Sequence, residues 1–508
     1  MAGIWDRLRF LGSAAAGLLA SGCSLPPGRA TPRAGRVRAA GATSSTADTL
    51  DPARQAAVMD YCRCNMFYDG LTKLDELQHP VPALAEAIDT RDARTWTIKL
   101  RRGVSFHDGK RLTPEDVVYS FARHKDPAVG STAKTFMGQF QEVRAFGTDA
   151  VRITLTGPNA DLPNILGMQP FKIIRAGTKE FHTANGTGPF RCAEFSPGNR
   201  SISVRFDDYW RGPVRIGEVE LFAIADESAR INALLSGDVD LITEVNPRIA
   251  KRLVEQKMNL LESKAGGYTD LVMRVDQAPG RNPDFVEGMK LLMDREAMQR
   301  AIFRGHATIA NDHPIPPSNP YFNAELPQRP FDPERARFLF RKAGFAGATI
   351  PMIVSSAASK SEDMAVLIQE GGRRAGVNID IQRRPPDGYW AHTWMKVPIC
   401  FGNVNQRPTA DIIFTQFFSS SASWNESGWN NPRFDRLLIE ARGSTDEALR
   451  HSIYSEMQAM VHRECGIGIP LFLSILDAYN PRIKGIRPMP QGGLMGYDFA
   501  AHIWIEDQ

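Results

Sequence analysis

The sequence lacks the residue patterns that mark the common catalytic and metal-binding sites. Its 508 residues include only six cysteines and ten histidines, and the histidines are scattered. Cys62 and Cys64 are separated by a single residue, which is not the spacing of zinc ligands. The chain has no Gly-x-Ser-x-Gly elbow, no His-Glu-x-x-His motif and no P-loop. These absences argue against an enzyme, so we expect no catalytic residue, no metal and no cofactor.

Cysteine is also too scarce to form a disulfide framework. Apart from Cys23, the number of cysteines is odd, so at least one thiol stays unpaired within the chain. We expect buried free thiols, and a single long-range disulfide is the alternative in an oxidising compartment. The five residues are Cys62, Cys64, Cys192, Cys400 and Cys465.

Neither sign of charge is in large excess. The formal net charge of +4 comes from 61 basic and 57 acidic side chains. Removal of residues 1–22 would leave 59 basic and 56 acidic side chains, a net charge of +3. A balance this close to zero predicts no nucleic-acid partner.

Long apolar runs are absent except near the start of the chain. The run from Phe10 to Ala20 follows two arginines and is too short to span a bilayer, so it indicates an export signal. Small residues directly before Cys23 resemble a lipoprotein box. We expect a signal peptide over 1–22, acylation of Cys23, and a location in the periplasm or on the outer face of the cell membrane. Cleavage without lipidation, which would release a free protein, is the alternative.

Residues 95–123 form the most regular stretch of the chain. Apolar and polar residues alternate over 96–100, as in a half-buried strand. Asp108-Gly109 supplies the positive φ of a tight turn, and Thr113 followed by Asp116 can cap a helix. The stretch therefore predicts a strand, a turn and a helix.

Two motifs have both a chemical and a structural interpretation. His107 and Asp108 could act as acid and base, but a histidine in such a turn is expected to be solvated. The glycine-rich segment Gly186–Phe190 lacks the Lys-Ser/Thr of a phosphate-binding loop and opens no helix, so it is expected to be a structural turn.

Residues 95–123 resemble the signature of the family 5 extracellular solute-binding proteins, the peptide, opine and nickel receptors of ABC importers. Nearly every fixed position of that signature is present. Further matches to the family follow in the same order along the chain: TLDP at 49–52, GTGPF at 186–190, YWRG at 209–212, GDVD at 237–240, DREAMQRAIFRG at 294–305 and FDP at 331–333.

The resemblance implies an α/β, bilobal, type II periplasmic-binding-protein-like fold. Two mixed-sheet lobes would enclose the ligand in a cleft between them, with an inserted subdomain in the first lobe. The implied organisation is a signal peptide (1–22), a flexible tether (23–35), lobe I (36–265, with the inserted subdomain at about 51–176), lobe II (266–477) and a C-terminal return to lobe I (478–508).

Apolar spacing predicts three helices in the second lobe. The first runs from Asp284 to Phe303, and another begins after Phe331. The proline-rich residues 314–333 between them predict no regular element. The third helix, Thr445 to His462, has an apolar face made by Leu449, Ile453, Met457, Met460 and Val461.

The segment 389–429 is the candidate for the ligand-binding wall of lobe II. Trp390, Trp394 and Trp424 suit the enclosure of an organic ligand, although packing in the lobe core is an equal alternative. In many peptide receptors of the family an acidic residue in the corresponding part of this segment pairs with the ligand's ammonium group. No acid lies between Asp387 and Asp411 here, and Arg407 stands close to the expected position.

A guanidinium binds carboxylate or phosphate through paired hydrogen bonds, so we expect Arg407 to hold an anionic group of the ligand. A surface arginine is the alternative. Asn425 is expected to add a neutral hydrogen bond.

The resemblance implies a substrate-binding protein that captures a peptide or peptide-like solute and delivers it to ABC permease subunits in the inner membrane. We expect a monomer. A sensor or chaperone with the same fold is the alternative function, and a hydrolase is a weaker one.

Overall fold

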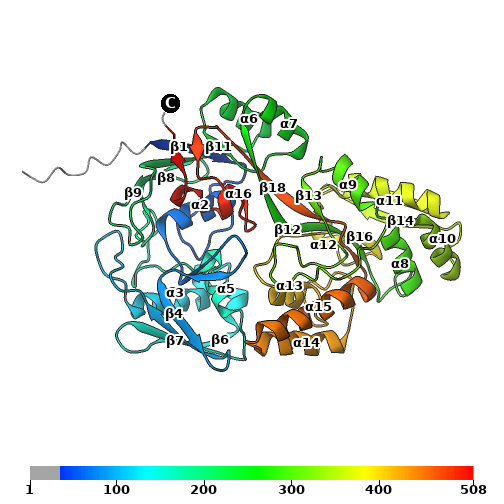
Figure 1. The fold of residues 1–508 in the computed structure, drawn as a ribbon, viewed down its shortest axis with the longest axis horizontal. Coiled ribbons are helices and arrows are strands. Elements are labelled where there is room, and N and C mark those ends of the chain that lie inside the picture. The colour runs from blue at the N-terminus through cyan, green and yellow to red at the C-terminus, as the bar shows by residue number, and fades with distance from the viewer. Residues whose placement is uncertain (1–34, 507–508) are drawn as a thin grey trace, which may run out of the picture.

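The computed structural model describes residues 35–506. The predicted signal peptide, Cys23 and all but the last residue of the predicted tether lie outside these residues. The chain folds into two halves joined by the long strands β12 (Asn259–Met273) and β18 (Leu471–Tyr479), which Figure 1 shows running from one half to the other. The predicted boundaries after residues 265 and 477 fall inside these two strands.

A ten-stranded mixed sheet runs through both halves. Its order is β16-β12-β18-β11-β1-β10-β9-β8, with β13 paired to β18 and β17 to β12. Strand β1 pairs in parallel with β10 and β11, whereas the other pairs are antiparallel. The remaining strand bounds are β16 (Ile399–Val404), β11 (Leu241–Ile242), β1 (Arg36–Gly41), β10 (Glu218–Ala223), β9 (Arg200–Arg205), β8 (Phe190–Ser196), β13 (Ala307–Ile309) and β17 (Ile467–Gly468).

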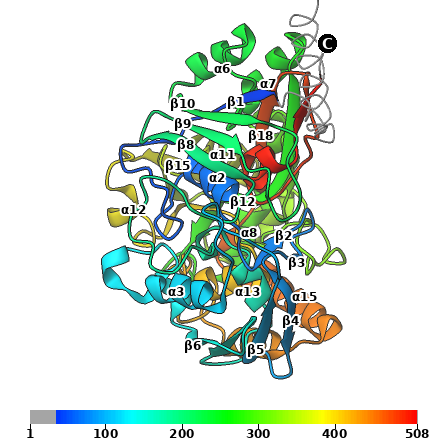
Figure 2. The ribbon, with the colours of Figure 1, turned by 90° about the vertical axis from the view of Figure 1, so that its left-hand side faces the viewer.

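The predicted strand, turn and helix of residues 95–123 are confirmed. Strand β5 (Thr95–Leu100) lies in a four-stranded sheet of order β4-β5-β7-β6, which α3 (Pro114–Lys125) covers. The Asp116 carboxylate accepts a hydrogen bond of 2.8 Å from the Thr113 N–H and caps this helix. Figure 2 shows this layer below strands β8 to β10. The other strands are β4 (Ala85–Thr90), β6 (Phe140–Ala145) and β7 (Ala150–Leu155).

His107 is half-buried and bonded to the chain, and not simply solvated as predicted. Its Nε2 lies 3.0 Å from the Gly188 carbonyl oxygen, and its ring packs edge-on against Phe206. Burial lowers the pKa of His107. A Cβ at Gly186 would lie 1.9 Å from the backbone oxygen of Phe67, so only glycine allows this close approach. The signature stretch 95–123 and the glycine-rich segment 186–190 therefore pack against each other, and this long-range contact could not be inferred from local sequence.

The single helix predicted over Asp284–Phe303 is wrong. Two helices replace it, α8 (Pro283–Leu291) and α9 (Arg295–Ala301). The side chain of Asp294 accepts a hydrogen bond of 2.8 Å from the Ala297 N–H and so caps the N-terminus of α9 as a separate helix. The proline-rich residues 314–333 contain no helix or strand until α10 (Pro333–Lys342) begins at the last of them.

The other predicted helices of this half are present. They are α10 (Pro333–Lys342) and α15 (Glu447–Glu464), whose predicted apolar face is buried apart from Leu449, which is 42% exposed. The further helices are α2 (Val58–Phe67), α4 (Lys134–Met137), α5 (Leu162–Leu166), α6 (Glu227–Ser236), α7 (Pro247–Glu255), α11 (Ser361–Ala375), α12 (Tyr389–His392), α13 (Ala410–Phe417), α14 (Pro432–Gly443) and α16 (Gly493–Gly496). Short strands β2 (Thr72–Leu74) and β3 (Pro80–Pro82), β14 (Thr349–Val354) and β15 (Asn378–Arg383), and β19 (Ile483–Lys484) and β20 (Trp504–Ile505) form three two-stranded sheets.

The five cysteines within residues 35–506 are all free thiols. Four are buried and Cys192 is half-buried. Over the same residues, no group of His, Cys, Asp or Glu side chains is arranged to hold a metal ion. No helix in the described part of the chain combines the length and apolar character needed to cross a bilayer.

Candidate ligand-binding site

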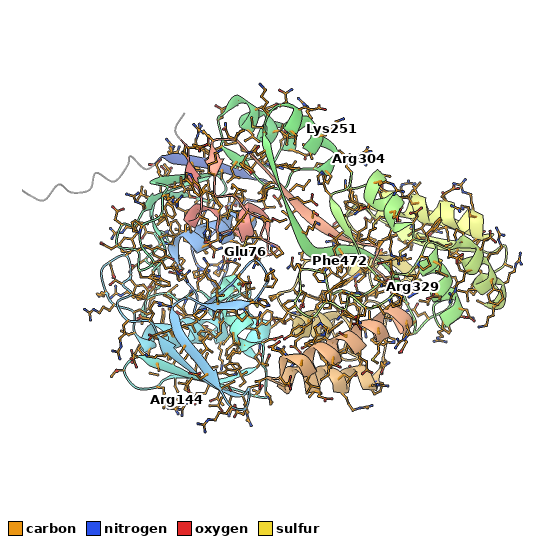
Figure 3. All side chains as sticks on the ribbon, in the orientation of Figure 1. Glu76, Arg144, Lys251, Arg304, Arg329 and Phe472 are labelled. Atoms are coloured by element: carbon orange, nitrogen blue, oxygen red, sulfur yellow. The ribbon has the colours of Figure 1, made fainter. Side chains whose placement is uncertain are left out.

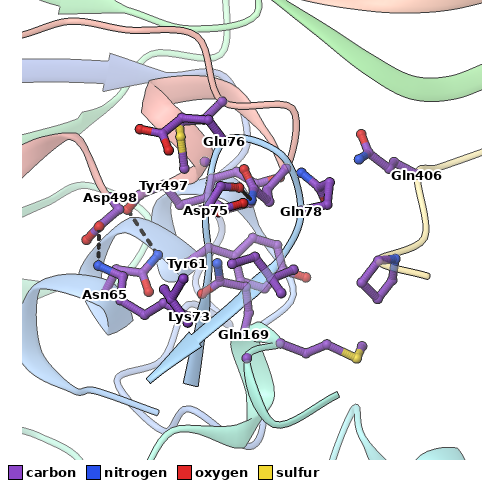
Figure 4. Close-up of a pocket in the computed structure, with 18 of the residues that line it drawn as sticks. Tyr61, Asn65, Lys73, Asp75, Glu76, Gln78, Gln169, Gln406, Tyr497 and Asp498 are labelled. Atoms are coloured by element: carbon purple, nitrogen blue, oxygen red, sulfur yellow. Dashed lines mark hydrogen bonds and ion pairs between the residues drawn. The ribbon is translucent and has the colours of Figure 1, made fainter. Parts of the chain in front are cut away.

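Two adjoining cavities lie between the halves of the molecule. One has a volume of about 440 Å³ and the other about 780 Å³. They share five lining residues, so they form one branched cleft. Gln406 approaches from the wall opposite the other labelled residues in Figure 4. The shared residues are Tyr61, Gln406, Arg407, Gln491 and Tyr497.

One wall of the cleft is built from α2 and the C-terminal segment. Tyr61 and Asn65 are one helical turn apart on α2 and face the same way. The rings of Tyr61 and Tyr497 lie 5.0 Å apart, and the Asn65 amide donates a hydrogen bond of 3.2 Å to the Tyr497 carbonyl. Tyr497 has a φ of 71°, a strained conformation for a residue with a side chain. These contacts hold two polar side chains at the cleft surface.

The opposite wall is formed by the end of β16 and the residues directly after it in the chain. The side-chain carbonyl oxygen of Gln406 accepts a hydrogen bond of 2.8 Å from the Gly266 N–H. The side-chain amide nitrogen of Gln406 is thereby left available to a ligand. The Arg407 Nε donates to Gln416 at 2.7 Å, and Nη1 donates to the Asn405 carbonyl at 2.9 Å. Burial lowers the pKa of Arg407. Its Nη2 bonds to no group of residues 35–506, so this wall presents free donors.

Charged side chains concentrate in the smaller cavity. Lys73 forms an ion pair with Asp498, which also accepts a hydrogen bond of 2.9 Å from His502. Burial by itself would raise the pKa of Asp498, but Lys73 and His502 outweigh it and hold that pKa well below its usual range. Glu76 pairs with Arg487 at 2.8 Å; Figure 3 labels Glu76 at this edge of its half. These acids are therefore already neutralised.

The larger cavity has two charged lining residues, Arg407 and the exposed Glu244. Its lining consists mainly of hydroxyl, amide and apolar groups, including Tyr268 and Asn403 from the wall that carries Arg407. The strands β12 and β18 contribute Gly267 and residues 473–476. A cleft with one strongly charged branch and one mainly uncharged branch suits an organic solute with an ionic end.

Comparison with known proteins identifies the family. The description "bacterial extracellular solute-binding proteins, family 5 middle" matches residues 79–426, which is more than half of the chain. The chain belongs to this family of solute-binding proteins. The resemblance inferred from the signature is thereby confirmed, and the members of the family are binding proteins.

The curated relatives of this solute-binding protein align over most of their length. Heme-binding protein A of Haemophilus influenzae is 28% identical over 484 residues, covering 86% of this chain and 85% of that protein. The dipeptide-binding protein of Escherichia coli is 26% identical over 458 residues, covering 81% and 84%. The glutathione-binding protein GsiB of Escherichia coli is 25% identical over 489 residues, covering 89% and 92%.

Solved structures share the fold. HbpA2 from Haemophilus parasuis superimposes with a TM-score of 0.84 at 21% identity, covering 93% of this chain and all of that one. The periplasmic binding protein DppA from Helicobacter pylori in complex with the peptide STSA gives 0.75 at 21% identity, covering 94% and 99%. The predicted type II periplasmic-binding-protein-like fold is confirmed.

Among the five side chains that the sequence suggested for ligand binding, Arg407 lines both cavities. Trp424 lies next to it, with its ring centre 6.0 Å from the guanidinium carbon and its side chain 44% exposed. The amide of Asn425 donates to the Ser419 and Trp429 carbonyls, at 3.3 and 2.6 Å. Asn425 thus ties its own loop together beside Trp424.

The other two tryptophans belong to a separate cluster. Trp390 and Trp394 pack edge to face with ring centres 5.6 Å apart, and neither lines the two cavities. The Trp394 Nε1 donates a hydrogen bond of 2.6 Å to the buried carboxyl group of Glu426. Trp390 is 41% exposed. These contacts favour packing as the role of this pair.

Sequence reasoning missed the wall formed by Tyr61, Asn65, Gln491 and Tyr497. The polar pair on α2, at a spacing of four within a mostly buried helix, is the one local signal that could have indicated it. The C-terminal segment gives no comparable signal, because its place beside α2 depends on the pairing of β18 with β11.

Proposed function

We propose that this solute-binding protein serves an ABC importer outside the cytoplasm, capturing a peptide or peptide-like solute with a carboxylate or phosphate group and delivering it to permease subunits in the inner membrane. Family membership supports the receptor role, and relatives named for dipeptide and glutathione binding support the ligand class. The proposal assigns the protein binding without turnover, as a monomer in the periplasm.

The observation that carries the ligand assignment is the state of Arg407. Its guanidinium is partly buried in the cleft, and its hydrogen bonds go to an amide oxygen and backbone carbonyls. Desolvation without a counter-charge is unfavourable for a cation. A ligand anion at Nη2 would supply that counter-charge, with Trp424 and Phe417 beside it.

Substitution of Arg407 tests whether this residue binds an anionic group of the ligand. Arg407→Ala is expected to weaken ligand binding about ten- to a hundredfold, because a hydrogen bond to a charged group contributes roughly 1.5–3 kcal/mol. Arg407→Lys keeps the charge but loses the planar fork, so it should weaken binding less than alanine does. Calorimetry with the solute that native mass spectrometry finds in undenatured protein measures both.

Arg384→Ala is the matched control, because Arg384 is an exposed arginine of the same half and lines neither cavity. It should bind as the wild type does. Wild-type affinity in both Arg407 variants would make Arg407 a surface residue and remove the anion assignment.

The lipid anchor is a separate part of the proposal. If the mature protein begins at an acylated Cys23, cells fed labelled palmitate should label the wild type and leave Cys23→Ala unlabelled. The variant should also move from the membrane fraction to the soluble fraction. Equal labelling of both proteins would show that Cys23 is not the attachment site.

A further inference from the structure

Lys172 is a buried cation that faces the smaller cavity without a counter-ion. It follows the 3-10 turn Gln169–Phe171 and is 6% exposed. Within residues 35–506 its ammonium group makes no hydrogen bond and no ion pair, yet it lines the 440 Å³ cavity. Burial and the nearby Lys73 lower the pKa of Lys172. A buried ammonium group of this kind is costly unless something neutralises it.

Asp69 and Asp498, the two carboxylates whose charges act on Lys172, are already bonded to other groups. Asp69 accepts hydrogen bonds from Thr187 at 3.1 Å and Trp210 at 2.9 Å. Asp498 is held by Lys73 and His502. Both acids act on Lys172 electrostatically, but neither comes within ion-pair distance. Among residues 35–506 no carboxylate forms an ion pair with Lys172, so a direct ion pair is left to an anion that enters the cavity.

Lys172 and Arg407 belong to opposite halves of the molecule and line the same cavity. The lining of that cavity carries five Lys or Arg side chains and three Asp or Glu side chains, an excess of two positive charges. Of the three carboxylates, Asp498 and Glu76 are paired, and Asp75 accepts the backbone N–H groups of residues 77 and 79. The fifth cation, Arg211, is exposed and stacks on Trp210. Lys172 and Arg407 are therefore the two cations of this lining that are at least partly buried and have no ion pair among residues 35–506.

We propose that the solute carries two anionic groups, one bound by Lys172 and the other by Arg407, so that it bridges the two halves. This inference rests on the proposed function and narrows its ligand to peptides or conjugates with at least two carboxylates. The 780 Å³ branch, which apart from Arg407 and Glu244 is lined by uncharged groups, would hold the neutral part of the solute. A solute with one anion would leave one of the two cations buried and unpaired.

The test uses matched tetrapeptides that differ by Glu or Gln at one position, so that each pair differs by one carboxylate. An equimolar pool is dialysed to equilibrium against the protein, and the bound members are quantified by mass spectrometry. The proteins are the wild type, Lys172→Met and Arg407→Met, with Lys179→Met as a control at an exposed lysine outside both cavities.

The wild type and the Lys179→Met protein should prefer the Glu member of each pair by about ten- to a hundredfold. The preference should collapse in Lys172→Met and Arg407→Met. Removal of an uncompensated buried charge should also leave the ligand-free Lys172→Met protein with a melting temperature at least equal to that of the wild type. A lower melting temperature would assign Lys172 a structural partner and overturn the inference.

Equal binding of Glu and Gln members by the wild type, or an unchanged preference in Lys172→Met, would overturn the two-anion ligand and leave the receptor function standing. If the wild type binds no peptide, the peptide-like ligand of the proposed function is wrong, and the two-anion inference fails with it.

Discussion

Replacement of Asp312 by asparagine is expected to lower the free energy of unfolding by about 3–5 kcal/mol, because it leaves the buried Arg295 guanidinium without its counter-charge and Arg329 with only Glu287. Asp312 is fully buried. Its carboxylate accepts hydrogen bonds from Arg295 Nη2 at 2.8 and 2.7 Å and from Arg329 Nε at 2.7 Å. The Ile469 N–H adds a further bond of 3.0 Å. Figure 3 labels Arg329 within the half that holds α8 to α15.

The charges around Asp312 favour its ionised form. Burial by itself would raise the pKa of this carboxyl group, but Arg295 and Arg329 outweigh burial and lower the pKa. The neutral amide of asparagine cannot replace that interaction. Urea denaturation followed by circular dichroism measures the loss.

Glu296→Gln is the matched control for Asp312→Asn. Glu296 pairs with Arg300 at 3.1 Å on the surface, and both side chains are about 70% exposed. Such a pair contributes roughly 0–1 kcal/mol, so this variant should unfold nearly as the wild type does. A loss in Asp312→Asn no larger than in the control would show that the buried network adds nothing to stability.

The second large effect is a pH dependence that Glu426→Gln should remove. Asp270 and Glu426 are buried, and their carboxyl groups lie together beside Gly402. A Cβ at Gly402 would lie 2.1 Å from Glu426 and 2.6 Å from Asp270, so glycine is needed above the pair. Two carboxyl groups this close, far from compensating cations, share a proton.

Burial raises the pKa of Glu426 to about 7. The folded protein therefore keeps a proton that the unfolded chain releases above the usual glutamate pKa of about 4.5. The stability that this proton provides is complete below about pH 4.5 and is lost as the pH rises through 7. The wild type should lose about 2–3 kcal/mol between pH 5 and 8 through this group.

The variant Glu426→Gln keeps the acceptor for the Trp394 Nε1 and does not titrate. Its unfolding free energy should exceed that of the wild type at pH 8 and change less between pH 5 and 8. Glu440→Gln, on the exposed side of α14, should follow the wild type. Parallel pH profiles of wild type and Glu426→Gln would contradict a shared proton at this pair.

Much of the local structure followed from sequence because it depends on neighbours along the chain. The capped start of α3 needs only Thr113 and Asp116, and the motifs identify the family without any tertiary contact. The break at Asp294 was missed because apolar spacing continues across it, and a capping aspartate inside an apolar pattern gives a weak signal. Local hydrogen bonds thus explain both the success and the error.

The sequence by itself determined the family, the type II fold and the presence of Arg407 where an acid is usual. Tertiary structure alone decided what each charged side chain does. Arg295 is neutralised by Asp312, which lies 17 residues away, whereas Lys172 and Arg407 share a cavity and form no ion pair within residues 35–506. Composition cannot distinguish these cases, because the distance between charges is set by the long-range pairing of β12 with β18 that brings the two halves together.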